Sequence, residues 1–162
     1  TTLSVDLMVC STFTTPAWLW GDAVVGLCSI LLLSRMWGDI SIPVALIGKV
    51  IDKISKELND CEGVKTIYPF GHVADGNIHF IIGKDSDDDD LKSKINDIIY
   101  NNTKLVDGSI SAEHGIGLDK KKYLIKSRSE DEIELMRLIK KSIDPKNILN
   151  PGRVIWHKIL SL

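Results

Sequence analysis

The segment Gly71–His79, which reads GHVADGNIH, contains a strong turn signal between two β-forming stretches. The dipeptide Asp75-Gly76 favours a tight hairpin turn, because type I′ geometry needs positive φ at both central residues. A hairpin centred on this dipeptide pairs His72 with His79, and a loop of four residues keeps that register. Directly opposed residues lie on one face of a sheet with their Cβ atoms about 5 Å apart. The segment therefore predicts a β-hairpin that brings two imidazoles together.

The residues on both sides of this turn predict the strands of the hairpin and its apolar face. The runs 64–72 and 78–83 are rich in β-forming residues. Successive side chains of a strand point to opposite faces. Apolar side chains should therefore form the core on the face away from the histidines: Val73, Ile78, Phe80 and Ile82.

Further elements are expected before and after the hairpin. Residues 39–43 alternate as a short strand stopped by Pro43. Apolar spacings of three and four predict helices, and these carry Leu46, Val50, Ile54 and Leu58; then Leu91, Ile95, Ile98 and Ile99; then residues 119–126 and 130–143. The acidic run 85–90 lacks the spacing of a calcium loop and suits a helix N-terminus. The order of elements predicts an α+β domain, and no GxGxxG or GK[ST] motif indicates a nucleotide site.

Composition describes an ordinary globular chain of about one domain. The 162 residues are 44% hydrophobic and 26% charged, with a formal net charge of −2. This balance gives no electrostatic reason to bind nucleic acid. Three scattered cysteines without CxxC spacing argue against a disulfide framework and indicate a reducing compartment.

Residues 1–37 differ from the rest and are left unassigned, whereas residues 38–162 are taken as the domain. The stretch 17–33 is apolar apart from Asp22 and a few small or polar residues. Spanning a membrane takes about 20 apolar residues, and the uninterrupted run 23–33 is shorter. We expect a helix packed on its neighbours or an extension foreign to the domain. A membrane-associated segment is the alternative.

A second polar motif, Ser109–Gly117, reads SISAEHGIG and places Glu113 beside His114. The hairpin histidines with Glu113 would give two nitrogen ligands and one oxygen, as in catalytic divalent-metal sites. His114 could then act as a base near neutral pH. The alternative is that these histidines are structural. His157 lies outside both motifs and is expected to be a surface residue.

Three segments, 70–80, 108–117 and 144–153, together resemble the C-terminal domain of FAD-linked oxidases of the vanillyl-alcohol oxidase type. The D-lactate, D-2-hydroxyglutarate and glycolate dehydrogenases are the members most similar to it. The resemblance covers residues 39–154. It implies an incomplete ferredoxin-like substrate domain, with an antiparallel sheet and helices packed on it, that works with a separate flavin-binding domain or subunit.

The resemblance also implies the roles of individual residues. His72, His79 and Glu113 match the family's ligands for a divalent metal such as zinc, and His114 matches its catalytic base. Asn150 lies in the tail motif that returns towards the FAD. The implied reaction oxidises a small 2-hydroxy acid to the 2-oxo acid in the cytoplasm, or in mitochondria of a eukaryote. Since no flavin domain is visible, the isolated chain is expected to be inactive.

Two positions depart from the family pattern. Ile81 stands where the lactate and hydroxyglutarate members usually carry an asparagine that holds substrate. Trp37 stands where hydroxyglutarate-type members carry a lysine. These changes leave the hydroxy acid open. Two other readings also remain: a metal-dependent hydrolase that uses the same ligands, and a non-catalytic remnant or metal-binding interaction domain.

Overall fold

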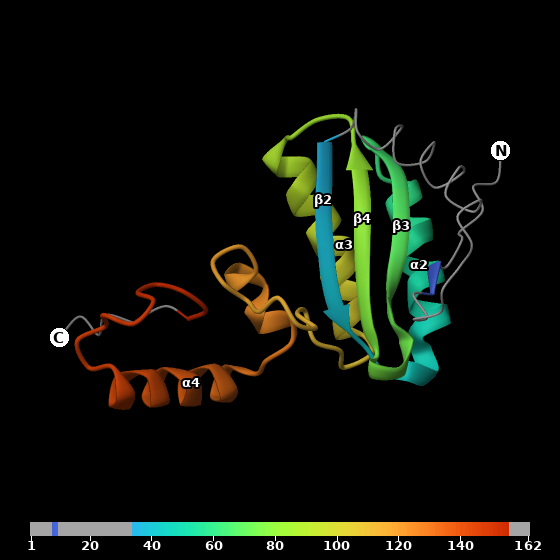
Figure 1. The fold of residues 1–162 in the computed structure, drawn as a ribbon. Helices are drawn as coiled ribbons and strands as arrows, with labels where there is room; N and C mark the ends of the chain where they lie inside the picture. The colour runs from blue at the N-terminus through green and yellow to red at the C-terminus, as the bar shows by residue number, and fades with distance from the viewer. Residues whose placement is uncertain (1–7, 10–33, 156–162) are drawn as a thin grey trace, which may run out of the picture.

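A computed structural model describes residues 8–9 and 34–155, which form an α+β fold built on one sheet (Figure 1). The sheet has the order β1-β3-β4-β2. Three of its strands are antiparallel neighbours, whereas β1 (Met8–Val9) pairs with β3 in parallel. The antiparallel strands are β2 (Ser34–Ser41), β3 (Val64–His72) and β4 (Asn77–Lys84). The predicted α+β class with an antiparallel sheet is confirmed.

Two helices cover one face of this sheet, and the side chain of His79 lies on the opposite face (Figure 1). They are α2 (Ile47–Asn59) and α3 (Asp89–Lys104). The core lies between them and the even-numbered residues of β2 and β4. Its fully buried members include Ile40, Ile54, Leu58, Ile78, Phe80, Ile82, Ile95 and Ile99. The predicted core residues of β4 are confirmed, and Val73 packs against the core while only partly buried.

β2 is longer than the strand expected over residues 39–43. It begins at Ser34, so its first four residues belong to the segment 1–37 that the sequence left unassigned. Every residue of β2 pairs with β4, from Ser34 opposite Lys84 to Ser41 opposite Asn77. The apolar stretch 17–33 lies outside the described residues.

The register predicted for the hairpin is wrong by two residues. His72 pairs with Asn77 and Phe70 pairs with His79, so the two histidines are diagonal rather than directly opposed. The turn is a 3-10 segment, η3 (Val73–Asp75), followed by Gly76 in the left-handed conformation. Its position is set by a hydrogen bond from the Ile42 N–H to the Gly76 carbonyl, which hairpin rules do not include. A shift of two preserves the face of every side chain, so both histidines still lie on the same face.

Gly76 should be the most sensitive glycine of the hairpin. Its φ is +72°, and an added Cβ would lie 2.2 Å from the Ile42 carbonyl oxygen. The left-handed conformation alone costs an L-residue about 1–2 kcal/mol. We therefore expect Gly76→Ala to lower the free energy of unfolding by at least about 2 kcal/mol in urea titrations.

Gly48, in α2, provides the matched control. No atom lies within 4 Å of a Cβ added there. Gly48→Ala should raise the free energy of unfolding by about 0.5–1 kcal/mol, because alanine is the better helix former. Equal effects at both glycines would contradict the described turn.

The remaining helices follow the predicted order with one difference. The acidic run caps α3 as expected, because the Asp88 side chain accepts from the Asp90 N–H. Residues 119–126 were expected to be a helix, but the structure has a 3-10 helix, η4 (Lys121–Lys126). A further 3-10 turn, η2 (Val44–Leu46), precedes α2. The last helix is α4 (Glu130–Ile143), opened by a capping box between Ser129 and Glu132. No helix in the described ranges is long and apolar enough to cross a membrane.

Candidate metal centre

His79 lies on the sheet face opposite the two helices and is almost fully buried, with 5% exposure. It stands in the middle strand β4, between Asp39 of β2 and Phe70 of β3. The Phe70 ring packs against the imidazole with 5.2 Å between ring centroids. The Nε2 atom of His79 lies 2.9 Å from Oε1 of Glu113. A buried strand residue therefore meets the loop residue that the sequence grouped with it.

The three predicted metal ligands come together at this point. One side-chain donor atom each from His72, His79 and Glu113 lies within 4.8 Å of the others. The two imidazoles have centroids 6.2 Å apart and are nearly perpendicular. Two nitrogens and one carboxylate oxygen at such separations fit a divalent ion with positions left for substrate. His72 and Glu113 are exposed, so an ion would reach the group from solvent.

His114, the predicted base, stands over the same group. Its ring stacks on that of His79, with centroids 5.5 Å apart and an interplanar angle of 28°. Its side chain is 56% exposed. A histidine with both a fixed neighbour and access to solvent is suited to exchanging a proton with a bound molecule.

Asp39 and Lys120 are parts of this site that the sequence did not single out. Asp39 is 2% exposed, and its Oδ2 lies 2.9 Å from the Lys120 ammonium nitrogen. The same ammonium donates to the backbone carbonyls of Asp39 and Ile110. Burial acts to raise the pKa of Asp39, but the hydrogen bond and charge of Lys120, together with hydrogen bonds from His114 and Ser111, outweigh it, so the pKa lies below its ordinary value. Asp39 is therefore a buried carboxylate held in its charged form.

The carboxylate of Asp39 also holds the loop that carries Glu113 and His114. Its Oδ2 accepts from the hydroxyl of Ser111 and from the backbone N–H groups of Ala112 and His114. Two backbone hydrogen bonds between Ser41 and Ser109 fix the start of that loop to the end of β2. No local pattern indicates these hydrogen bonds, because the donors lie more than 70 residues from Asp39.

Asp39, His79 and His114 form a second group whose donor atoms lie within 4.8 Å of one another. Both groups contain His79. Its Nδ1 atom faces Asp39, whereas its Nε2 atom faces Glu113. Asp39 is buried, and its Oδ2 already accepts four hydrogen bonds. The group of His72, His79 and Glu113 has two exposed members, and its carboxylate does not accept four hydrogen bonds as that of Asp39 does. It is therefore the better candidate for an ion.

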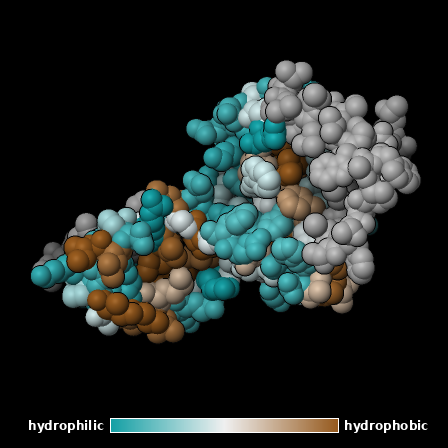
Figure 2. All heavy atoms as spheres, in the orientation of Figure 1, coloured by the Kyte–Doolittle hydropathy of each residue, from teal (hydrophilic) through white to brown (hydrophobic). Residues whose placement is uncertain are grey.

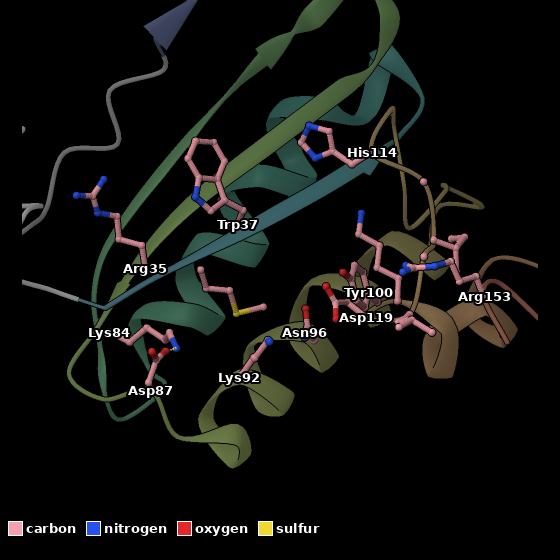
Figure 3. A pocket seen from close by; sticks show the side chains of 16 residues that line it. Arg35, Trp37, Lys84, Asp87, Lys92, Asn96, Tyr100, His114, Asp119 and Arg153 are labelled. Carbon is pink, nitrogen blue, oxygen red and sulfur yellow. Dashed lines mark hydrogen bonds and ion pairs between the residues drawn. The ribbon is translucent and has the colours of Figure 1, made fainter. Parts of the chain in front are cut away.

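A cavity of about 600 Å³ lies beside the centre, along β2 and α3 (Figure 3). Trp37 and His114 line it on the side of the sheet, so it adjoins the metal group without containing its three ligands. Several of its other lining side chains are cationic: Arg35, Lys84, Lys92 and Arg153. Lys84 pairs with Asp87. The mixture of basic groups favours an anionic occupant.

Asn150, predicted to approach a flavin, lies in the tail that follows α4. It is exposed, has φ of +48°, and accepts from the Arg153 N–H. Asp144 shapes this tail by accepting from Lys140 and from the N–H groups of Ile148 and Leu149. The pKa of Asp144 is lowered to about 2, mainly by the hydrogen bond that the Lys140 ammonium donates to it.

Apolar side chains gather on α4 and this tail, where Figure 2 shows them as brown spheres. Six of them are more than half exposed: Leu135, Leu138, Ile139, Ile143, Ile148 and Leu149. Monomeric proteins rarely expose a continuous apolar patch of this kind unless another surface covers it.

Comparison with known proteins identifies the relatives of this chain. The family model described as "FAD linked oxidases, C-terminal domain" matches residues 32–154. D-2-hydroxyglutarate dehydrogenase, mitochondrial, of Danio rerio is 40% identical over 117 residues, which cover 72% of this chain and 22% of that protein. The protein of the same name from Arabidopsis thaliana is 37% identical over 123 residues, covering 76% and 22%.

A D-lactate dehydrogenase also matches. The mitochondrial protein D-lactate dehydrogenase [cytochrome] 1 of Saccharomyces cerevisiae is 32% identical over 145 residues, covering 84% of this chain and 24% of that protein. The chain thus spans about a quarter or less of the length of these curated relatives. It belongs to the FAD linked oxidases and corresponds to their C-terminal domain.

Proposed function

We propose that this domain supplies the substrate site and the metal ligands of an FAD-dependent enzyme that oxidises a 2-hydroxy acid to the 2-oxo acid. The observation that carries the proposal is the meeting of His79 Nε2 and Glu113 Oε1 at 2.9 Å, with His72 in the same group. These atoms come from two strands and a distant loop, and the relatives of the chain are named as dehydrogenases of 2-hydroxy acids.

The residues present fit a divalent metal. His72, His79 and Glu113 would hold it with two neutral nitrogens and one carboxylate, which leaves a positive charge for an anionic ligand. Zinc suits a set of this chemistry. Such an ion would supply positive charge next to an anionic substrate, which would lower the pKa of a hydroxyl held beside it.

His114 would take the proton of the 2-hydroxyl on a ring nitrogen. Its stacking on His79 places it beside the metal group, and its exposure gives it a route to return that proton to solvent. The C2 hydrogen would leave with its bonding electron pair, and a bound FAD would supply the acceptor. The carbon–oxygen double bond would form as the proton and the hydride leave.

The substrate proposed is a small 2-hydroxy acid, and two features bear on its side chain. Ile81 lies two residues beyond His79 on the same sheet face and pairs with Trp37 of β2. The surface next to the metal group is therefore apolar. The cationic side chains of the adjoining cavity lie farther along β2 and α3.

The partner proposed is a flavin-binding domain or subunit. The exposed apolar residues of α4 and the tail provide a surface for it, and the relatives are about four times longer than the matched region. Asn150 lies on this surface, where contact with the flavin remains a prediction. We place the protein in the cytoplasm or, as the names of the relatives suggest, in mitochondria.

Metal content tests the proposal. The purified chain, incubated with Zn²⁺ and then freed of excess metal, should retain one equivalent by elemental analysis. His79→Ala should retain much less than one equivalent, because it removes the nitrogen that faces Glu113. His157→Ala, a change of the same type outside both motifs, should retain the wild-type amount.

The outcomes distinguish the rival functions. Retention of one equivalent by His79→Ala would count against the ligand set. Hydrolytic turnover by the isolated Zn²⁺-loaded chain would favour a hydrolase, which needs no flavin. Failure of the wild-type chain to retain metal would favour a non-catalytic remnant.

A further inference from the structure

We infer that Asp39 is a positioning residue that fixes both halves of the candidate metal centre: the imidazole of His79 and the loop that carries Glu113. The inference rests on the proposed function, because it concerns how that centre is held. It assigns the two carboxylate oxygens of Asp39 to different tasks.

The first task belongs to Oδ2, which faces the loop. It accepts from Lys120 at 2.9 Å, Ser111 at 3.1 Å, and the N–H groups of Ala112 at 3.2 Å and His114 at 3.3 Å. Glu113 stands between the last two of these residues. Since the N–H groups of the residues before and after Glu113 are held by one oxygen, the position of the Glu113 carboxylate depends on Asp39.

The second task belongs to Oδ1, which faces His79. This oxygen is buried and has no hydrogen-bond partner among the described residues, yet Nδ1 of His79 lies 3.5 Å from it. A buried acceptor left without a donor is costly, and an approach of roughly half an ångström would complete a normal hydrogen bond. With an ion in the group, Nε2 would bind that ion, and the one proton of the neutral imidazole would be on Nδ1, where Oδ1 can accept it.

That arrangement matches the direction in which His79 points. Its Nε2 is the nitrogen that lies 2.9 Å from Glu113. Metal-binding histidines commonly donate their second N–H to a carboxylate, which fixes the tautomer and the ring orientation. Asp39 would therefore act through His79 rather than as a ligand in the group it forms with His79 and His114.

Lys120 makes this use of a buried carboxylate possible. It supplies the positive charge next to Oδ2 and binds the Ile110 carbonyl at the same time. Oδ1 thus remains available for His79.

The experiment compares Asp39→Asn with Ser111→Ala in the full chain. An asparagine has one oxygen, so it cannot accept from His79 and from the loop together, and its amide group would face one of these donors. Ser111→Ala removes one donor to Oδ2 and leaves the side facing His79 intact. We expect Zn²⁺ affinity, measured by competition with a chelator, to fall tenfold to hundredfold in Asp39→Asn and less than threefold in Ser111→Ala.

A second readout reports on His79 alone. In the Zn²⁺-loaded wild-type chain, ¹⁵N imidazole shifts should show His79 bound to the metal through Nε2 with its proton on Nδ1. The Nδ1–H signal should shift in Asp39→Asn and stay in place in Ser111→Ala. Coordination through Nδ1 in the wild-type chain, or unchanged affinity in Asp39→Asn, would overturn the inference.

Two further arms keep the test decisive. If Asp39→Asn fails to fold because Lys120 is left unpaired, the double variant Asp39→Asn/Lys120→Met removes the buried charge and is compared with Lys120→Met. If the wild-type chain binds no Zn²⁺, the proposed function fails. The contact between Asp39 and His79 is then followed in the metal-free chain, where a change of the His79 Nδ1 resonance in Asp39→Asn but not in Ser111→Ala supports the link and equal Nδ1 shifts in all three chains overturn it.

Discussion

Replacing Lys120 with methionine should lower the free energy of unfolding by about 3–5 kcal/mol. We expect no other single lysine substitution to destabilise the fold as much. The Lys120 side chain is 13% exposed and its partner Asp39 is 2% exposed. Methionine fills a similar volume but leaves the Asp39 carboxylate buried without its counter-charge. Three hydrogen bonds to Asp39 and Ile110 are lost as well.

Lys126 is the matched control for this substitution. Its side chain is 18% exposed, so it is nearly as covered, but its partner Asp97 is 51% exposed. Water screens such a pair, and Lys126→Met should cost about 1 kcal/mol or less. Urea titrations of both variants measure the difference. Similar losses in the two variants would show that the carboxylate of Asp39 does not depend on Lys120.

The sequence predicted the faces of the hairpin better than its register. Alternation along β4 places His79 opposite in direction to Ile78 and Phe80 whatever the turn is, and the structure confirms this. The register depended on the turn, and the turn depends on the contact between Ile42 and Gly76. Ile42 lies more than 30 residues away, so no rule for hairpin loops contains that contact.

The sequence likewise predicted only part of the candidate site. Spacing around the turn placed His72 and His79 on one face, and the motif Ser109–Gly117 supplied Glu113 as the third ligand, which the resemblance to a family then matched. The sequence did not indicate Asp39, because a lone aspartate in an alternating strand predicts a solvent-exposed side chain. It is buried because the loop carrying Ser111 and His114, and Lys120 beyond it, cover that part of β2. Its burial is a property of the assembled fold, which no local pattern encodes.

Replacing Glu113 with glutamine should separate metal binding from folding. The substitution keeps the size of the side chain and removes the charge that a divalent ion requires, so we expect Zn²⁺ affinity to fall roughly hundredfold or more. The Glu113 side chain is 46% exposed, and its contact with His79 therefore contributes little to folding. The free energy of unfolding of the metal-free chain should stay within about 1 kcal/mol of wild type.

Glu134→Gln provides the control for this change. Glu134 is 57% exposed and pairs with Arg137 on α4, far along the chain from both motifs. Isothermal titration with Zn²⁺ should give the wild-type affinity for this variant. If Glu113→Gln also binds as tightly as wild type, then His72 and His79 must complete the site with another group. Asp39 would be the first candidate, because its donor atoms lie near His79 and His114. If Glu113→Gln instead loses both affinity and stability, the loop is part of the folded core, and Glu113 serves the fold as much as the ion.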